Sequence, residues 1–266
     1  MRRHVSCRLE ADIESAADIV LSVAVAAEVP RTDESLLATL DGRPVELREL
    51  QDDHGVRLHA ANDVERGRLV VAYAATVTGA AAPPPVDDID LVHFRRPSRY
   101  CESDRLAALA RSEFRGLEDQ DLLDAVTSWV GQRVAYIPGS SRPTDGAVTT
   151  LLSREGVCRD FAHLVIAMLR ACDVPARLVS VYAPGLQPMD FHAAAEACID
   201  GRWLVADATA LAPRSSMVRI ATGRDAADTA FLTSTGNDVR LVTLEVTAIT
   251  EGDLPRDDAT VPTQLH

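Results

Sequence analysis

The sequence holds a cysteine, a histidine and an aspartate whose surroundings suit a nucleophilic site: Cys158, His192 and Asp207. A cysteine thiolate attacks carbonyl carbon when a nearby imidazole takes the thiol proton and a carboxylate orients that imidazole. These three residue types therefore suffice for acyl transfer. Whether the three side chains meet depends on the elements that carry them.

Cys158 falls at the predicted start of a helix. Apolar positions in residues 156–172 follow helical spacing, Gly156 permits a tight entry, and the segment 173–175 contains a proline that ends the run. Free N–H groups and the positive end of the helix dipole stabilise a thiolate at such a start. On this helix a disulfide with Cys172 is excluded, because the two residues lie roughly 21 Å apart. The alternative for Cys158 is a small buried hydrophobic residue, as predicted for Cys172 and Cys198.

A predicted hairpin places His192 beside Asp207. The dipeptide Asp200-Gly201 lies between two strand-like runs and is typical of a two-residue turn. With that turn, Asp207 lies opposite Ala194, and His192 is its diagonal neighbour on the same face. Diagonal positions are about 7–8 Å apart at the backbone, within reach of long side chains. His163, by contrast, lies roughly 140° around the helix from Cys158 and is poorly placed as its base.

The chain divides into a β-rich first part and a mixed second part. Short strand-like runs separated by turns such as Asp41-Gly42 and Arg66-Gly67 predict a small sandwich or meander. A stiff segment with three consecutive prolines, at 82–88, marks the boundary. The predicted units are an all-β domain over 1–82, a linker over 83–103, a core over 104–250 and a flexible polar tail over 251–266.

In the second part, helices come before strands. We predict helices over residues 104–114, 119–134 and 144–152 ahead of the helix of Cys158, and strands over 176–182, 191–199, 203–207 and 241–249. This order predicts an α+β fold, with helices packed on an antiparallel sheet, rather than a doubly wound one.

Composition excludes several function classes. The 266 residues are 47% hydrophobic, enough for buried cores, and the net charge of −13 disfavours nucleic acid and anionic lipid as partners. Every basic residue is arginine, which excludes a Schiff-base lysine, a P-loop lysine and crosslinking through the chain's own lysines. The five scattered cysteines and the lack of a long apolar leader predict a reducing cytoplasm and no membrane association.

Four segments together resemble the core of bacterial transglutaminase-like proteins. They are GVCRDFAHL at residues 156–164, VPAR at 174–177, His192-Ala193, and DAT at 207–209. The resemblance covers roughly residues 106–236 and implies a papain-like α+β fold with a Cys-His-Asp triad. The superfamily includes transglutaminases, cysteine proteases and peptide N-glycanases, and its bacterial members often carry an N-terminal region similar to the β-rich part. The stretch at 223–228 also resembles one found in a bacterial subgroup.

Two positions depart from the family pattern. Members commonly have an aromatic residue two positions after the histidine, where this chain has Ala194. They usually follow the aspartate with proline, where this chain has Ala208. The first change could widen the substrate groove, but neither removes a catalytic atom.

The resemblance and the chemistry together imply a thioester mechanism on a peptide or glutamine-type amide. Cys158 would attack the carbonyl, His192 would accept and return the proton, and Asp207 would hold the imidazole. The Cys158 N–H is the first oxyanion donor, and Gln132 or Tyr136 is a candidate for the second. Water as acceptor makes a protease or amidase and an amine makes a transglutaminase; with no amine-binding motif, the sequence slightly favours hydrolysis.

A rival interpretation is an inactive binding module that keeps the fold. Ala194 and the uncertain second oxyanion donor allow it, whereas an inactive scaffold has no need for all three triad residues. No ligand cluster has metal spacing and no D-x-D-x-D-G loop is present, so we expect neither a metal nor another cofactor. A protein or peptide is the expected partner, and the oligomeric state is left open.

Overall fold

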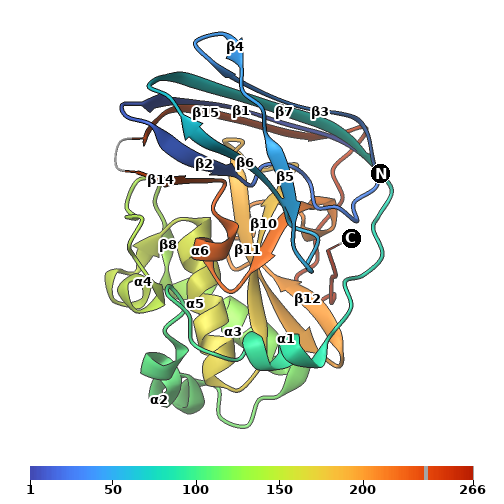
Figure 1. The fold of residues 1–266 in the computed structure, drawn as a ribbon. Coiled ribbons are helices and arrows are strands. Elements are labelled where there is room, and N and C mark those ends of the chain that lie inside the picture. The colour runs from blue at the N-terminus through green and yellow to red at the C-terminus, as the bar shows by residue number, and fades with distance from the viewer. Residues whose placement is uncertain (237–238, 266) are drawn as a thin grey trace.

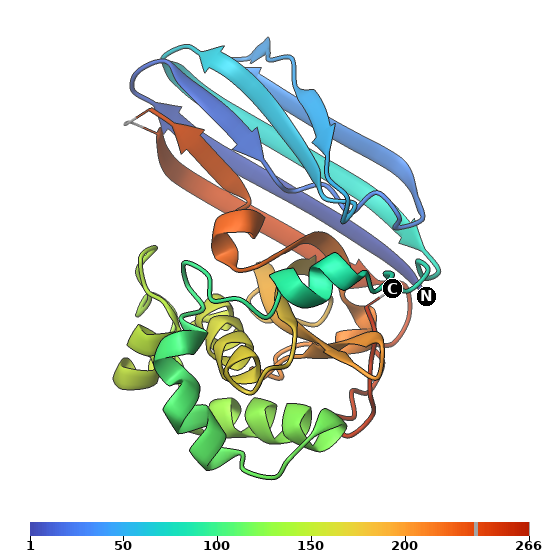
Figure 2. The ribbon, with the colours of Figure 1, turned by 60° about the horizontal axis from the view of Figure 1, so that its bottom comes forward.

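The computed structural model describes residues 1–236 and 239–265. A two-sheet β-sandwich lies over an α+β core, and the two ends of the chain lie close together (Figures 1 and 2). The expected α+β class with an all-β N-terminal part is therefore confirmed.

The sandwich is built from the first seven strands. Residues of β1 alternate between buried and exposed positions because one face of its sheet packs inward. One sheet has the order β15-β1-β7-β3-β4 and the other β14-β2-β6-β5. The strands are β1 (Arg2–Ile13), β2 (Ala17–Leu21), β3 (Arg31–Leu40), β4 (Arg43–Pro44), β5 (Arg48–Gln51), β6 (Arg57–Val64) and β7 (Gly67–Thr78).

The last two strands return to this sandwich. β14 (Leu232–Thr235) pairs with β2, and β15 (Val239–Thr250) pairs with β1 along nearly its whole length. Both strands lie within the range predicted for the core, 104–250; residues 237–238, inside that range, lie outside the described residues. Alternation identifies a strand but not its partner, so the sheet that β15 joins is a long-range choice.

The core centres on α5 (Cys158–Ala171), which is buried along almost its entire length. It packs against the antiparallel sheet β12-β11-β10-β13 and against the other helices. A short parallel pair, β8 (Ala135–Tyr136) and β9 (Glu155–Gly156), leads into α5. The remaining elements are α2 (Ser103–Glu113), α3 (Asp119–Arg133), α4 (Ala147–Ser153), β10 (Ala176–Tyr182), β11 (Phe191–Ile199), β12 (Arg202–Ala206), β13 (Val218–Gly223), a 3-10 turn (Arg214–Ser216) and α6 (Ala226–Thr229).

The predicted linker is packed against the core. It contains a short helix, α1 (Asp88–His93), followed by Phe94, whose ring meets Trp203 edge-on at 5.6 Å. The indole of Trp203 donates a hydrogen bond to the carbonyl of Pro85 at 3.2 Å. The linker therefore closes one side of the core sheet.

Most of the described tail, residues 251–265, is exposed, but a few of its residues contact the core. Leu265 is 2% exposed, and the Val205 N–H donates to the Thr263 carbonyl at 2.8 Å. Arg214 binds the carboxylate of Asp257 at 3.0 Å. Because the tail is polar in composition, sequence reasoning did not predict the buried leucine and the ion pair that anchor it.

Within residues 1–236 and 239–265, no helix has the length and apolar character needed to cross a lipid bilayer.

Candidate active site

Cys158 is the first residue of α5 and is half-buried. The carboxylate of Asp160 accepts a hydrogen bond from the Val157 N–H at 2.8 Å, which caps the helix end beside the thiol. A Cβ on Gly156 would lie 2.7 Å from the Cβ of Asp160, so only glycine allows this close entry. Ser141 donates to the other oxygen of Asp160 at 2.9 Å and ties the preceding loop to the helix.

The β11–β12 hairpin has the predicted register. Ile199 faces Arg202, and Ala195 faces Ala206, which places Asp207 immediately beyond the paired residues. His192 Nε2 lies 2.7 Å from Asp207 Oδ2, and both side chains are buried. The predicted contact between imidazole and carboxylate is present.

Asp207 is held at both oxygens. Its Oδ1 accepts hydrogen bonds from the Thr209 N–H at 2.9 Å and the Thr209 hydroxyl at 2.7 Å. Burial alone would raise the pKa of Asp207, but the His192 charge and the Thr209 hydrogen bonds outweigh it and lower the pKa below its usual range. Sequence reasoning missed the role of Thr209, although a hydroxyl two residues after an aspartate is a signal for such a turn.

The imidazole of His192 is held in its protonated, cationic form. Burial would lower its pKa, but the Asp207 carboxylate and the Cys158 thiol raise the pKa to about 10. Because Nε2 contacts Asp207, Nδ1 is the nitrogen left for the thiol. That nitrogen is buried and has no hydrogen-bond partner among the described residues. The imidazole of His192 is therefore held as a cation beside the side chain of Cys158.

Tyr136 lies beside the nucleophile. The parallel pairing of β8 and β9 sets Tyr136 opposite Gly156, two residues before Cys158. Burial and the Cys158 charge raise the pKa of Tyr136 to about 12, so its hydroxyl keeps its proton. The side-chain amide of Gln132 instead donates to Ser128 on its own helix at 2.9 Å. Of the two candidate oxyanion donors, Tyr136 is the one whose strand pairs directly with the segment that leads into Cys158.

The structure explains the first departure from the family pattern, Ala194, and offers no explanation for the second, Ala208. Ala194 is 1% exposed and shares a buried cluster with Val205 and Leu265, so the tail fills space beside this position. An aromatic side chain there would compete with Leu265. The carbonyl of Ala208 approaches α3 so closely that a Cβ on Gly131 would lie 2.7 Å from it.

His163 serves the fold. Its Nε2 accepts a hydrogen bond from the Ala226 N–H at 3.1 Å, and its ring stacks on Tyr100 at 5.2 Å. Burial holds its pKa far below the usual range, so it is a neutral acceptor. The segment 223–228 anchors α5 in the same way, because the Arg224 carbonyl accepts from Arg170 at 2.8 Å.

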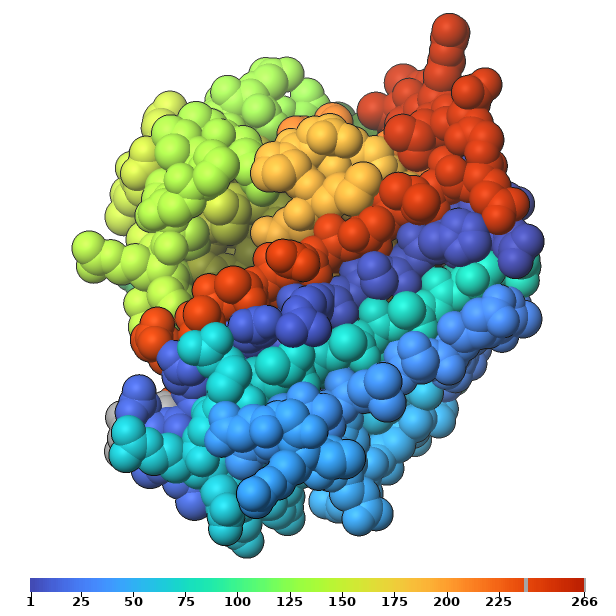
Figure 3. Space-filling model, turned by 90° about the horizontal axis from the view of Figure 1, so that it is seen from above, coloured from blue at the N-terminus to red at the C-terminus, as the bar shows by residue number. Residues whose placement is uncertain are grey.

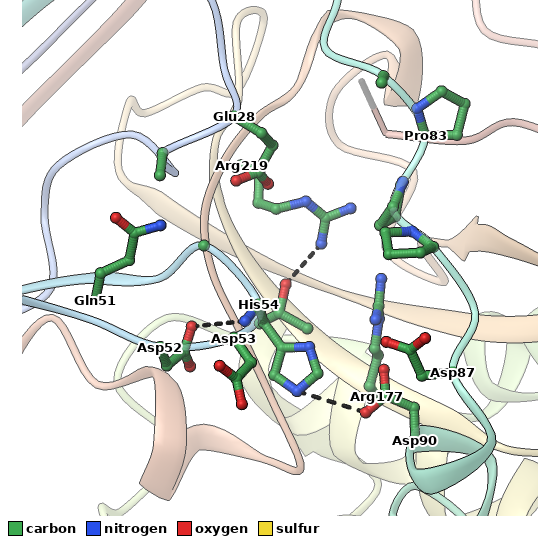
Figure 4. A pocket seen from close by; sticks show the side chains of 16 residues that line it. Glu28, Gln51, Asp52, Asp53, His54, Pro83, Asp87, Asp90, Arg177 and Arg219 are labelled. Carbon is green, nitrogen blue, oxygen red and sulfur yellow. Dashed lines mark hydrogen bonds and ion pairs between the residues drawn. The ribbon is translucent and has the colours of Figure 1, made fainter.

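Cavities lie on several sides of the core. One of about 360 Å³ adjoins Asp207 between α3, β12 and the tail. Another of about 500 Å³ lies where sandwich loops and the proline segment meet the core, and none of the three candidate residues lines it. Figure 4 shows Arg177 and Arg219 at this cavity, with acidic side chains around them. Behind it, the buried Glu196 binds Arg219 at 2.6 Å and Arg177 at 2.8 Å.

This chain is similar to known proteins in sequence and in structure. A family profile described as the transglutaminase-like superfamily matches residues 108–208, a span that contains Cys158, His192 and Asp207. The solved structure titled a "Putative Cysteine Protease" from Cytophaga hutchinsonii is 34% identical, with a TM-score of 0.89. The similarity covers 99% of this chain and 96% of that one. This chain belongs to the transglutaminase-like superfamily.

Curated relatives extend this transglutaminase-like assignment only over short stretches. An uncharacterized protein of Mycobacterium leprae is 32% identical over 88 residues, which is 33% of this chain and 32% of that protein. An uncharacterized protein of Mycobacterium tuberculosis is 42% identical over 62 residues, 23% of this chain and 20% of that protein. The matches thus span a third or less of these relatives, and they add no activity to the superfamily assignment.

Proposed function

We propose that this chain is a cysteine-dependent acyl-transfer enzyme that acts on peptide or glutamine-type amide bonds through a thioester on Cys158. The observation that carries the proposal is the buried His192–Asp207 pair, 2.7 Å apart, with its second imidazole nitrogen left for the thiol at the start of α5. Membership of the superfamily supports the general kind of enzyme.

In the proposed reaction, the Cys158 sulfur attacks the amide carbonyl as a thiolate. The carbon–nitrogen bond then breaks, and the His192 imidazolium gives its proton to the leaving amine. Attack by water or a second amine on the thioester releases the acyl group and returns the thiol. Asp207 keeps the imidazole oriented and stabilises its charge in both halves.

The negative charge on the carbonyl oxygen needs donors in the transition state. The Cys158 N–H at the start of α5 is one, because the first N–H groups of a helix have no partner within it. We assign the second to the Tyr136 hydroxyl, which stays protonated and lies beside Cys158.

Hydrolysis is the form of the reaction that we favour. Water is always available, and the described residues contain no feature that singles out an amine acceptor. The similar protein from Cytophaga hutchinsonii carries the name "Putative Cysteine Protease".

All five cysteines are free, which fits the predicted reducing cytoplasm. An inactive binding module is the competing proposal.

The decisive experiment measures the rate at which iodoacetamide labels Cys158 as a function of pH, read by mass spectrometry. Cys172 and Cys198 are internal controls, because burial raises the pKa of both thiols and should keep their labelling slow below pH 8. Fast labelling of Cys158 near pH 6 that the His192→Ala variant abolishes would support the proposal. Labelling like that of the two control thiols, unchanged by the variant, would favour the inactive module.

A further inference from the structure

One edge of the sandwich is open beside the active site. β15 is the last strand of its sheet and has no second strand partner among the described residues. The hydrogen bond from the Glu251 N–H to the Arg2 carbonyl, at 2.9 Å, sets which residues face β1. In an antiparallel pair this orientation alternates, so the N–H and C=O groups of Leu244 point to the open side.

Two large apolar side chains are exposed within residues 241–245, which we call the accessible half of this edge. Val246 and Ala248 are 6% and 2% exposed because their side chains lie on the face of the sheet that packs against a buried cluster. Leu241 and Val242 are 41% and 36% exposed, and Leu244 is half-buried. The register with β1 shifts between Thr243 and Leu241, so the irregularity is confined to Val242 and pairing with β1 is regular from Thr243 onward.

The accessible half adjoins the segments that carry the candidate site. Leu244 packs on the same buried cluster as Phe191, the residue before His192. Figure 3 shows a hollow bordered by β15 in red, by the gold segment that leads into β11, and by the yellow-green segments that precede Cys158. The core lies on the far side of this hollow.

We propose that the edge of β15 from Leu241 to Glu245 binds the substrate polypeptide as an added antiparallel or parallel strand. Main-chain hydrogen bonds to Leu244 would hold the peptide, and the exposed Leu241 and Val242 would contact its apolar side chains. The substrate class is thus an extended, unstructured peptide segment that accepts main-chain hydrogen bonds, not a helix or a small free amide. This inference rests on the proposed function for the chemistry that follows binding.

The test compares two substitutions at one position. Leu244→Pro removes both the side chain and the outward N–H, whereas Leu244→Ala removes the side chain alone; proline is tolerated on an edge where the N–H takes no part in the ladder. Both are made in the Cys158→Ala protein, so that binding is measured without turnover. The probe is a fluorescein-labelled decapeptide of alternating Thr and Val with a central Gln, followed by fluorescence anisotropy, with thermal unfolding as the check on folding.

We expect Leu244→Pro to weaken binding at least about tenfold relative to Leu244→Ala, since a strand addition loses its main-chain contact. A copy of the peptide with N-methylated central amides should lose binding to the unaltered edge to a similar extent. Equal affinities for the two variants, no effect of N-methylation, or no binding of the decapeptide would overturn the proposal. So would a dimer that only Leu244→Pro dissociates, because the edge would then pair with a second copy.

The outcome separates this inference from the proposed function. Iodoacetamide labelling of Cys158 in the Leu244→Pro protein should match that of the unaltered chain, since the substitution leaves the triad in place. Edge-dependent binding without any turnover of peptides would retain the β15 site and reject the enzyme. Rapid turnover that is insensitive to Leu244→Pro would retain the enzyme and reject the β15 site.

Discussion

Strand β11 carries two buried ionisable groups, and they are arranged in opposite ways. Glu196 is saturated: Arg177 and Arg219 bind both of its oxygens, and although burial opposes it, these cations lower the pKa to about 2. His192, four residues earlier on the same face, is bonded on one side by Asp207 and has its Nδ1 without a hydrogen-bond partner among the described residues. A completed network can only stabilise the fold, whereas an incomplete one can exchange a proton.

This comparison predicts that substitutions at the two ends of β11 affect different properties. The largest effect on chemistry should come from the thiol that His192 serves. Cys158→Ala should lower turnover of a peptide substrate by about 10³-fold or more, because the thioester cannot form without the Cys158 sulfur. Steady-state kinetics and thermal unfolding together check it; Cys172→Ala is the matched control. Residual activity near that of the unaltered chain would remove Cys158 from the mechanism.

Loss of the orienting carboxylate should come next. Asp207→Asn should lower kcat by about 10²–10⁴-fold, because an amide cannot stabilise the imidazolium or hold its tautomer. The same substitution should bring the pKa of His192 down from about 10, since its main stabilising charge is lost. Nitrogen-15 NMR of the imidazole measures that pKa, and Asp200→Asn at the hairpin turn is the control. An unchanged titration would mean that the His192–Asp207 contact has no electrostatic role.

Substitution of Glu196, whose two oxygens are both bound, should lower the stability of the fold. Glu196→Ala leaves two buried guanidinium groups without their anion and should cost about 3–5 kcal/mol in the free energy of unfolding. Urea denaturation measures this cost, with the exposed Glu245→Ala on β15 as the control. If the folded fraction of Glu196→Ala labels at Cys158 at the normal rate, the two ends of the strand are independent. A loss of labelling without a loss of stability would contradict this division.

Thr209 offers a finer test of the reactive end. Thr209→Val removes the hydroxyl that donates to Asp207 at 2.7 Å and should lower kcat/KM about tenfold, the value of one hydrogen bond to a charged group. Thr209→Ser keeps the hydroxyl and should retain most of the activity. Equal losses in the two variants would show that shape matters at this position and the hydrogen bond does not.

The dependence of stability on pH tests the same two groups in the unaltered chain. The pKa of Glu196 falls from 4.5 to about 2 on folding, so its stabilisation is complete above pH 4.5 and lost as the pH falls toward 2. The pKa of His192 rises from 6.5 to about 10, so its stabilisation is complete below pH 6.5 and lost as the pH rises through 10. Urea denaturation across this range should show both limbs. Glu196→Gln should flatten only the acid limb and His192→Gln only the alkaline one; a variant that flattens the opposite limb would refute the assignment.

Local patterns were enough to predict much of the site. The helix that begins at Cys158 follows from apolar spacing and from a proline beyond its end, and both can be read within a few turns. The contact between His192 and Asp207 follows from a two-residue turn at Asp200-Gly201, because that turn sets the register of both strands. Such signals need no knowledge of the rest of the chain.

Groups brought together across long separations could not be predicted in this way. The choice of Tyr136 over Gln132 depends on β8 pairing with β9, and the structural role of His163 depends on the N–H of Ala226, 63 residues away. Sequence reasoning placed neither contact, because residue types alone do not specify which distant segments are neighbours.

By itself, the sequence determined the class of fold, the helix of Cys158, the hairpin of His192 and Asp207, and a triad of residue types suited to acyl transfer. Only the tertiary structure decided that β15 is the end strand of the first sheet and leaves its outer edge unpaired. It also decided that the tail buries Leu265 beside Ala194, and that His192 Nδ1 has no hydrogen-bond partner among the described residues. The physical reason is that periodicity and turns act over a few residues, whereas strand partners and buried clusters are chosen by the packing of the whole chain.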